Sequence, residues 1–376
     1  MELIRNSWNY NICSYQSSAI GGAISLDRSI IMQIYPAKVA TFIFVFVITL
    51  ILFSFFESEH YHAHLSDRSS NFSVCKLSAN LLRVATSTTR PSFDMAVLRN
   101  DKVVSKHILE FGLWDVHVLD ALQFILTQNP CENGKSIVLD VGANVGFFGL
   151  YAMARNCSVA FFEPQNGAGD AIEWSLCMMS RMNHRAQLIR QPVLNKSAVL
   201  FPDMADEKHF NTGSLGFDWC SKPKARCKAR PAAHLDNYML GSSASRPNVI
   251  GDSIIVMKID VEGFEMDVLK TATRLMETRA IKNILLELTP NIVRVEENSR
   301  MLRTLLANGF QLAEILRVTK PIADTSKPFL SRVRPVRSVD IETLLRGNQT
   351  DLWASQDDSS FEHYNASIHN FENHLL

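Results

Sequence analysis

The sequence predicts an α/β domain built on a doubly wound, mostly parallel sheet. Between about Pro91 and Arg346, short apolar runs alternate with amphipathic stretches, which is typical of βα units. One run, residues 253–259, is apolar up to Lys258, as expected of a parallel strand buried on both faces. A glycine-containing turn follows the first apolar run of the domain, where open α/β sheets commonly bind a ligand.

Each element follows from a local pattern, taken in chain order. Residues 116–126 place their apolar side chains on one helical face, and residues 136–141 (SIVLDV) form an apolar run of strand length. The other expected strands are residues 159–163, 187–193, 253–259, 283–288 and 310–315. The other expected helices are residues 146–155, 176–183, 266–276 and 297–306, the last closed by Asn308-Gly309. A long insertion separates the third strand from the fourth.

An apolar run without charge or proline, residues 39–56, predicts an N-terminal transmembrane helix. Lys38 precedes this run and Glu57 follows it, so the N-terminus should face the cytosol. A cleaved signal peptide fits less well, because a long polar stretch precedes the run and no small-residue cleavage site follows it. A buried core helix is the structural alternative. We expect a cytosolic segment (1–37), a signal anchor (38–56), a stem (57–90), the α/β domain (91–346) and a polar tail (347–376).

The cysteines and glycosylation sequons agree with a domain on the lumenal side of the membrane. Six of the seven cysteines follow the apolar run, and an even number in an oxidising compartment permits disulfides. Cys220 and Cys227 are the expected pair, and buried free thiols are the alternative. A sequon at Asn156 is expected to be too buried for use. The remaining sequons are at Asn71, Asn195, Asn348 and Asn365.

The turn after the first strand, Asp140 to Gly146 (DVGANVG), predicts a cofactor site. Glycine lets a ligand approach the backbone, and the following helix offers free N–H groups. The spacing differs from the G-x-G-x-x-G of dinucleotide sites, and it suits a carboxylate with a nearby ammonium group, which Asp140 would face. A purely structural turn is the alternative. Glu163, at the end of the second strand, is expected to accept hydrogen bonds from ribose hydroxyls.

Acidic residues follow the fourth strand, where ligands of open α/β sheets bind. Asp260 and Glu262 would share a face if the strand continued, and one carboxylate could take a proton from an acceptor hydroxyl. We expect Glu262 to be the general base and Asp260 to position the cofactor or the acceptor. The alternative is an acidic first turn of the next helix, which we expect for Glu265.

Taken together, these motifs resemble the FkbM family of methyltransferases. The resemblance rests on DVGANVG at 140–146, FFEP at 161–164, HLDNY at 234–238, MKIDVEGFEMDVLK at 257–270 and NILLEL at 283–288. It implies a class I methyltransferase fold, which is Rossmann-like, with S-adenosylmethionine as cofactor and hydroxyl groups as acceptors. It also implies that Glu163 binds the ribose and that Asp260 and Glu262 lie at the junction of cofactor and acceptor. The residues implied to line the cofactor are Gly142, Ala143, Asn144 and Gly146, beside Asp140.

The segment ahead of the first strand resembles the same family. It ends in Gly112-Leu113-Trp114-Asp115, where the family often has Glu in place of Asp115. The segment from Val199 to Arg230 matches poorly. There, lysines and arginines alternate with neutral residues from Lys222 to Arg230, which predicts a solvated face, with contact to an anionic acceptor as the alternative.

The expected function is therefore O-methylation of a glycan or another hydroxylated acceptor by a single-pass type II membrane protein of the Golgi or endoplasmic reticulum. The 38 basic and 38 acidic residues balance, which argues against a nucleic-acid partner. The carboxylates leave a metal possible, but no His/Cys ligand spacing is present and we assign no metal ligand. The alternatives are an inactive methyltransferase-like binding protein and a Golgi-type glycosyltransferase, although the domain lacks an Asp-x-Asp motif. The sequence indicates no oligomeric state.

Overall fold

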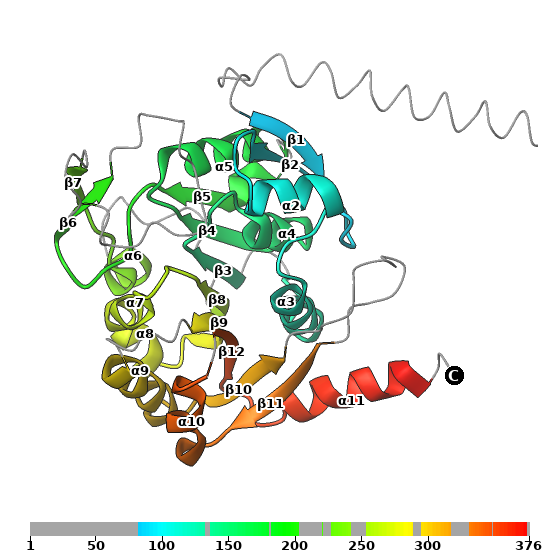
Figure 1. Cartoon of the computed structure of the whole chain (residues 1–376), viewed down its shortest axis with the longest axis vertical. Coiled ribbons are helices and arrows are strands. Elements are labelled where there is room, and N and C mark those ends of the chain that lie inside the picture. Colours follow the sequence, from blue (N-terminus) through cyan, green and yellow to red (C-terminus); the bar gives the residue numbers. More distant parts are fainter. Residues whose placement is uncertain are drawn as a thin grey trace, which may run out of the picture. The chain divides into compact units, whose positions relative to one another are not determined.

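Within the described residues, an eight-stranded sheet forms the centre of the domain (Figure 1). The computed structural model describes residues 82–131, 136–179, 182–202, 220, 227–241, 253–288, 295–316, 331–347 and 349–373. In spatial order, the strands are β11 (Arg332–Val336), β10 (Gln311–Leu316), β12 (Thr350–Ser355), β9 (Ile281–Leu288), β8 (Ser253–Ile259), β3 (Ser136–Val141), β4 (Ser158–Phe162) and β5 (Ala186–Ile189).

The pairing of these strands confirms the doubly wound, mostly parallel sheet. Strands β5, β4, β3, β8 and β9 are parallel, whereas β12 runs antiparallel between β9 and β10, and β11 is antiparallel to β10. From β3 the chain winds outward through β4 and β5, and it then returns to β8 on the other side of β3. The point between β3 and β8 is where such sheets bind ligands. The arrangement is a class I methyltransferase-like α/β fold.

Helices cover both faces of the sheet and enclose two hydrophobic cores. Val138 of β3 belongs to the first core and its neighbours Ile137 and Leu139 belong to the second, as the twofold alternation of a strand requires. The first core also contains residues of α2 (Val104–Phe111), α3 (Val116–Gln128), α4 (Phe147–Ala154), α5 (Asn166–Met178) and α11 (Ser360–Asn373). The second contains residues of α6 (Leu235–Leu240), α7 (Glu265–Thr271), α8 (Thr273–Glu277), α9 (Val295–Ala307) and α10 (Ile341–Leu345).

The expected polar tail from residue 347 is wrong, because this segment supplies a central strand. All six residues of β12 are buried between β9 and β10. Trp353 of this strand packs against Phe361 and Tyr364 of α11, with ring centroids 5.0 and 5.6 Å apart. The strand escaped the hydrophobic pattern because half of its residues are polar, and its Asp351 is satisfied by a distant histidine, His117.

The boundary expected between the stem and the domain, at residues 90 and 91, is also wrong, because the folded domain already includes residues from Leu82 onward. Strand β1 (Leu82–Thr86) forms an antiparallel pair with β2 (Asp94–Leu98). The backbone N–H of Ala96 in β2 donates to Ser175 Oγ of α5 at 2.8 Å, which fixes this pair to the main domain. The expected signal anchor lies outside the described residues. None of the described helices has both the length and the apolar character needed to cross a bilayer.

Several element boundaries differ from the expected ones. The expected strand 187–193 ends at Ile189, as β5. The expected helix 176–183 begins earlier, as α5 at Asn166, and the expected helix 266–276 is divided into α7 and α8 at Ala272. The carboxylate of Asp236, from the HLDNY motif, accepts the backbone N–H groups of Arg274 and Leu275 at 2.9 and 3.0 Å. This motif therefore stabilises the start of α8. The insertion before β8 contains β6 (Ala198–Pro202), β7 (Cys227–Pro231) and α6.

The expected disulfide Cys220–Cys227 is present. A second, Cys131–Cys157, joins the segment after α3 to the residue before β4. Cys177 is disulfide-bonded as well. Asn156, adjacent to Cys157, is exposed, which corrects the expectation that its sequon is buried.

Candidate functional site

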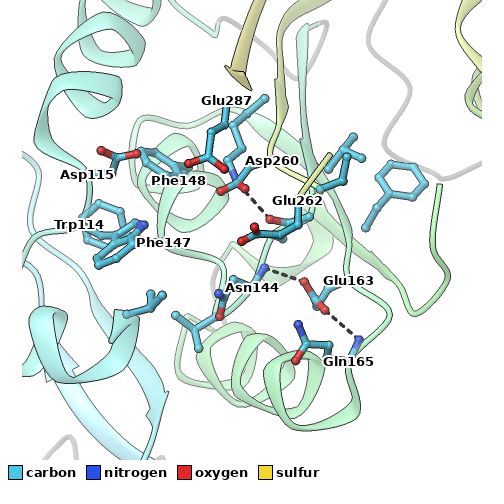
Figure 2. A pocket seen from close by; sticks show the side chains of 18 of the residues that line it. Trp114, Asp115, Asn144, Phe147, Phe148, Glu163, Gln165, Asp260, Glu262 and Glu287 are labelled. Atoms are coloured by element: carbon cyan, nitrogen blue, oxygen red, sulfur yellow. Dashed lines mark hydrogen bonds and ion pairs between the residues drawn. The ribbon is translucent and has the colours of Figure 1, made fainter. Parts of the chain in front are cut away.

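A cavity of about 650 Å³ opens at the carboxyl ends of β3, β4, β8 and β9 (Figure 2). Its floor is the turn after β3, and the ends of β4 and β8 flank this turn. Residues of α2 and of the segment leading into α3 line the opposite side, among them His107, Trp114 and Asp115. The cavity thus lies at the reversal point of strand order, and its volume is typical of a small-molecule site.

The glycines of the turn after β3 serve backbone packing. Gly142 has φ of 73°, and a Cβ atom there would lie 1.8 Å from the carbonyl oxygen of Asp260. Gly146 has φ of 86°, and a Cβ there would lie 2.9 Å from Ile172. Gly142, Ala143 and Asn144 line the cavity as expected, whereas Gly146 is not among the lining residues. The glycines therefore let β8 and α5 approach the turn closely.

Asp140 does not face the cavity, which corrects its expected role. Its side chain is fully buried and points toward α4, where Oδ2 accepts the backbone N–H of Gly149 at 2.9 Å. Its Oδ1 lies 3.8 Å from Lys258 Nζ. Burial raises the pKa of Asp140, and Lys258 opposes this shift. Asp140 therefore anchors the first turns of α4 and the buried lysine. The motif could not reveal this, because it does not show on which side of the strand the carboxylate lies.

Glu163 lies just after β4 and joins two loops of the cavity. Its Oε2 accepts the backbone N–H of Asn144 at 2.7 Å, and its Oε1 accepts that of Gln165 at 2.8 Å (Figure 2). Only 3% of the residue is exposed, and burial raises its pKa to about 7 although both N–H donors favour the anion. Each oxygen can still accept a second hydrogen bond. A carboxylate in this position can accept hydrogen bonds from a ligand in the cavity, and ribose binding by Glu163 stays a prediction.

Lys258 ties the acidic end of β8 to the turn after β3. Its Nζ donates to Gly142 O at 3.0 Å and to Asp260 Oδ2 at 3.1 Å. Burial opposes the charge on Lys258, but the carboxylates of Asp260 and Asp140 outweigh burial and raise its pKa. Asp260 is thereby held at the cavity wall, as the sequence predicts.

Three carboxylates converge at this wall. The oxygens of Asp260, Glu262 and Glu287 lie within 4.8 Å of one another. Burial, together with the neighbouring acids Asp260 and Glu265, raises the pKa of Glu262 to about 7. Burial and the carboxylates of Asp260 and Glu262 also raise the pKa of Glu287. Glu265 Oε1 accepts the N–H of Gly263 at 2.9 Å, so Glu265 belongs to the start of α7, as expected.

Sequence reasoning missed Glu287 and His117. Glu287 is the polar residue near the end of the apolar strand β9, and that position was a usable signal. His117 Nε2 lies 2.7 Å from Asp351 Oδ2 and 2.9 Å from Asp115 Oδ1. Burial disfavours its charge, but the hydrogen bonds to both aspartates outweigh burial and raise the pKa of His117 to about 9. No local pattern links His117 to Asp351, which lies far away along the chain.

Comparison with known proteins places this geometry in a family. Residues 140–312 match the sequence profile of the methyltransferase FkbM domain. This segment is an FkbM methyltransferase domain. Its cofactor is S-adenosylmethionine. No curated protein matches the chain.

Solved structures resemble the chain only distantly. The Thermus thermophilus 16S rRNA N2 G1207 methyltransferase, in complex with AdoMet and guanosine, is 13% identical, with a TM-score of 0.36 over 74% of this chain and 51% of that one. An Agrobacterium tumefaciens SAM-dependent methyltransferase is 11% identical, with a TM-score of 0.35 over 75% and 72%. The precorrin-6y C5,15-methyltransferase of Geobacter metallireducens is 10% identical, with a TM-score of 0.31 over 69% and 94%. These similarities do not carry a function to this chain.

The FkbM domain's cavity fits S-adenosylmethionine chemically. Glu163 offers carboxylate oxygens to ribose hydroxyls. Beside it, the buried Oε1 of Gln165 has no hydrogen-bond partner within the described structure, and this acceptor suits the exocyclic amine of an adenine. Pro192, Val193 and Leu194 add an apolar surface at this end of the cavity.

Proposed function

We propose that this protein is a membrane-anchored enzyme that methylates a hydroxyl group of a glycan or of another acceptor in the secretory pathway. The observation that supports it best is the convergence of Asp260, Glu262 and Glu287 on the wall of the cavity that also contains Glu163. Hydroxyl groups have a high pKa, so their methylation needs a proton acceptor beside the donor. An inactive binding protein would not need three carboxylates at one wall.

Residues at the other end of the cavity hold the cofactor in this proposal. S-adenosylmethionine supplies an activated methyl group on a sulfonium. Glu163 and Gln165 would bind its ribose and adenine, and the turn from Gly142 to Asn144 would hold its methionine end. Lys258 keeps that turn in place through Gly142 O. Holding the cofactor and the acceptor in one cavity would supply the positioning that methyl transfer mainly requires.

Glu262 is the proposed general base. Glu262 lies at the cavity rim. Because its pKa is about 7, a large fraction of the molecules carries a deprotonated Glu262 at neutral pH, and this carboxylate can accept a proton. As the acceptor oxygen gains the methyl group, its proton passes to a carboxylate oxygen of Glu262. Asp260 is held by Lys258 at 3.1 Å and positions the acceptor or the cofactor. Glu287, hydrogen-bonded by the side-chain amide of Gln349, completes the acidic wall.

The test of this assignment is a pair of neutral substitutions in the full-length protein. Glu262→Gln is expected to leave S-adenosylmethionine affinity nearly unchanged and to slow single-turnover methyl transfer by about 10²–10⁴-fold. Asp260→Asn is expected to weaken cofactor binding as well, because it removes the negative charge that pairs with Lys258. Calorimetry, melting temperature and transfer of a labelled methyl group separate these outcomes. A Glu262→Gln protein with normal turnover would end the assignment.

The proposed location is the lumen of the Golgi or endoplasmic reticulum, with the apolar segment 38–56 as a type II anchor. Disulfides Cys131–Cys157 and Cys220–Cys227 support an oxidising compartment. Protease treatment of intact microsomes should spare the domain and remove an N-terminal epitope tag. Digestion of the domain from the cytosolic side would refute this orientation.

A further inference from the structure

We propose that the cavity beyond the cofactor end binds an uncharged, polyhydroxylated ring, such as a neutral sugar residue, and that it excludes anionic acceptors. The inference rests on the proposed function, because it assigns the acceptor to the same cavity. It goes further by stating the charge and shape of the acceptor. Three observations carry it: an aromatic wall, an acidic wall, and the lack of an available cation among the described lining residues.

The aromatic wall comes from α2, from the segment before α3 and from the start of α4. Trp114 is half-buried and lines the cavity, and His107 packs edge-on against it with ring centroids 5.6 Å apart. Phe147 and Phe148 extend the same wall. Figure 2 shows Trp114 and Phe147 across the cavity from Glu163. The flat C–H face of a sugar ring packs well on such an aromatic surface, whereas a flexible chain gains less from it.

The acidic wall, together with Asp115 beside Trp114, offers hydrogen-bond acceptors whose positions are fixed. Asp115 is held by His117 at 2.9 Å and Asp260 by Lys258 at 3.1 Å. Glu287 accepts a hydrogen bond from the side chain of Gln349. A few immobilised polar groups opposite an apolar surface are what a specific small-molecule site needs. Hydroxyl groups can donate to these acceptors without a charge of their own.

The charges at this end disfavour an anion. Lys258 is the only lysine or arginine among the described lining residues, and Gly142 O and Asp260 engage its ammonium group. His117 is shared between two carboxylates, and burial lowers the pKa of His107. Each of these two cations, Lys258 and His117, already faces two carboxylates, so an anionic acceptor would meet a net negative surface. One like charge about 6 Å away, at an effective dielectric of 20, lowers affinity roughly a hundredfold before screening by salt.

Among the basic residues that the sequence offered for an anionic acceptor, Arg230 is engaged by its own neighbours. Of the alternating set from Lys222 to Arg230, the structure describes Lys228 and Arg230. Arg230 donates to Pro164 O at 2.9 Å and to Asn166 Oδ1 at 3.0 Å, so its guanidinium holds β7 against the loop after Glu163. An amine would suit the acids better than an anion. The same acids would keep it protonated, however, and a protonated amine cannot attack a methyl group.

The test measures acceptor binding separately from turnover. The full-length protein in detergent, saturated with S-adenosylhomocysteine, is titrated by saturation-transfer NMR with methyl glycosides of glucose, galactose, mannose and xylose. The matching uronic acids and amino sugars are titrated in parallel. We expect at least one neutral glycoside to bind and its uronic acid to bind at least tenfold more weakly. Equal or tighter binding of a uronic acid or an amino sugar, or no binding of any neutral glycoside, overturns the inference.

Variants locate the binding to this cavity. Trp114→Ala is expected to weaken neutral glycoside binding at least fivefold, and Trp114→Phe to retain most of it, with S-adenosylhomocysteine affinity unchanged in both. Asp115→Asn should reduce the ratio of the affinities for the neutral glycoside and its uronic acid roughly tenfold, because one repulsive charge is removed. Glu342→Gln, an exposed acid on α10, is the matched control and should change nothing. An unchanged affinity of Trp114→Ala for neutral glycosides counts against this site, as does an unchanged affinity ratio in Asp115→Asn.

The two proposals fail in different ways. A protein that binds neutral glycosides in this cavity but transfers no methyl group to them would contradict the proposed function alone. Methyl transfer to an anionic acceptor as fast as to its neutral counterpart would contradict this inference alone.

Discussion

Replacing Glu163 by glutamine should weaken cofactor binding without weakening the fold. In the native protein the Glu163 carboxylate accepts backbone N–H groups from Asn144 and Gln165 and is 3% exposed. Burial raises its pKa from 4.5 to about 7, so the folded state binds this proton more tightly than the unfolded state. The contribution of Glu163 to the stability of the cofactor-free protein is therefore most favourable below pH 4.5, and it falls as the pH rises toward 7.

The magnitudes follow from that shift. A displacement of about 2.5 pKa units corresponds to about 3 kcal/mol of stability lost above pH 7. Glutamine is neutral and avoids this cost, but it gives up one backbone hydrogen bond, which is worth about 1 kcal/mol. Glu163→Gln should therefore be at least as stable as the native protein at pH 8 without cofactor. Hydrogen bonds to a charged group are worth about 1.5–3 kcal/mol each, so S-adenosylmethionine affinity should fall at least roughly tenfold.

The assay combines melting curves at pH 5 and pH 8 with calorimetric titration of S-adenosylmethionine. Glu173→Gln, an exposed glutamate on α5 paired with Arg190, is the control and should leave the affinity unchanged. A folded Glu163→Gln protein with native affinity would refute the ribose assignment. A loss of several kcal/mol of stability at pH 8 would refute the argument from burial.

Three further predictions concern other residues. Gly142→Ala should cost more than about 2 kcal/mol and lower the melting temperature, because its Cβ would meet Asp260 O at 1.8 Å; a native melting temperature would contradict this packing. The pKa of His117 is raised from 6.5 to about 9, so its pairing stabilises the fold fully below pH 6.5 and is lost as the pH rises through 9. The stability lost over this pH range, up to about 3 kcal/mol, can be measured by melting curves at several pH values, and the loss should be absent in His117→Gln. In the lumen, the exposed Asn195 should carry a glycan. Asn365 should not, because the backbone of Val333 in β11 is hydrogen-bonded to the Asn365 side-chain amide; glycopeptide mass spectrometry tests both expectations.

Local pattern was sufficient to predict the elements that form the floor of the site. Strands β3 and β8 lie at the expected residues, because each is a short apolar run with clear ends. The turn from Gly142 and the acids after β8 are close together because parallel strands end at the same edge of the sheet. The placement of Glu163 follows from the same rule.

What the sequence did not predict depends on partners that are distant along the chain. Asp351 looked like part of a polar tail, because the histidine that satisfies it is 234 positions away. Glu287 was hidden in an apolar strand, and it became significant only when Asp260 and Glu262 were placed beside it. Asp140 was assigned to the cofactor because a motif records residue order but not which face of a strand a side chain occupies.

The central position of β12 bears on how the protein can be made. The strand is synthesised after β9 and β10, yet it lies between these two strands in the sheet. Until it arrives, the facing edges of those strands have no partner, and exposed edges invite aggregation. The domain therefore cannot complete its sheet until β12 has been synthesised. A premature stop codon before Thr350 would remove a central strand of the sheet, together with Asp351, which holds His117. Such a truncated chain should be inactive.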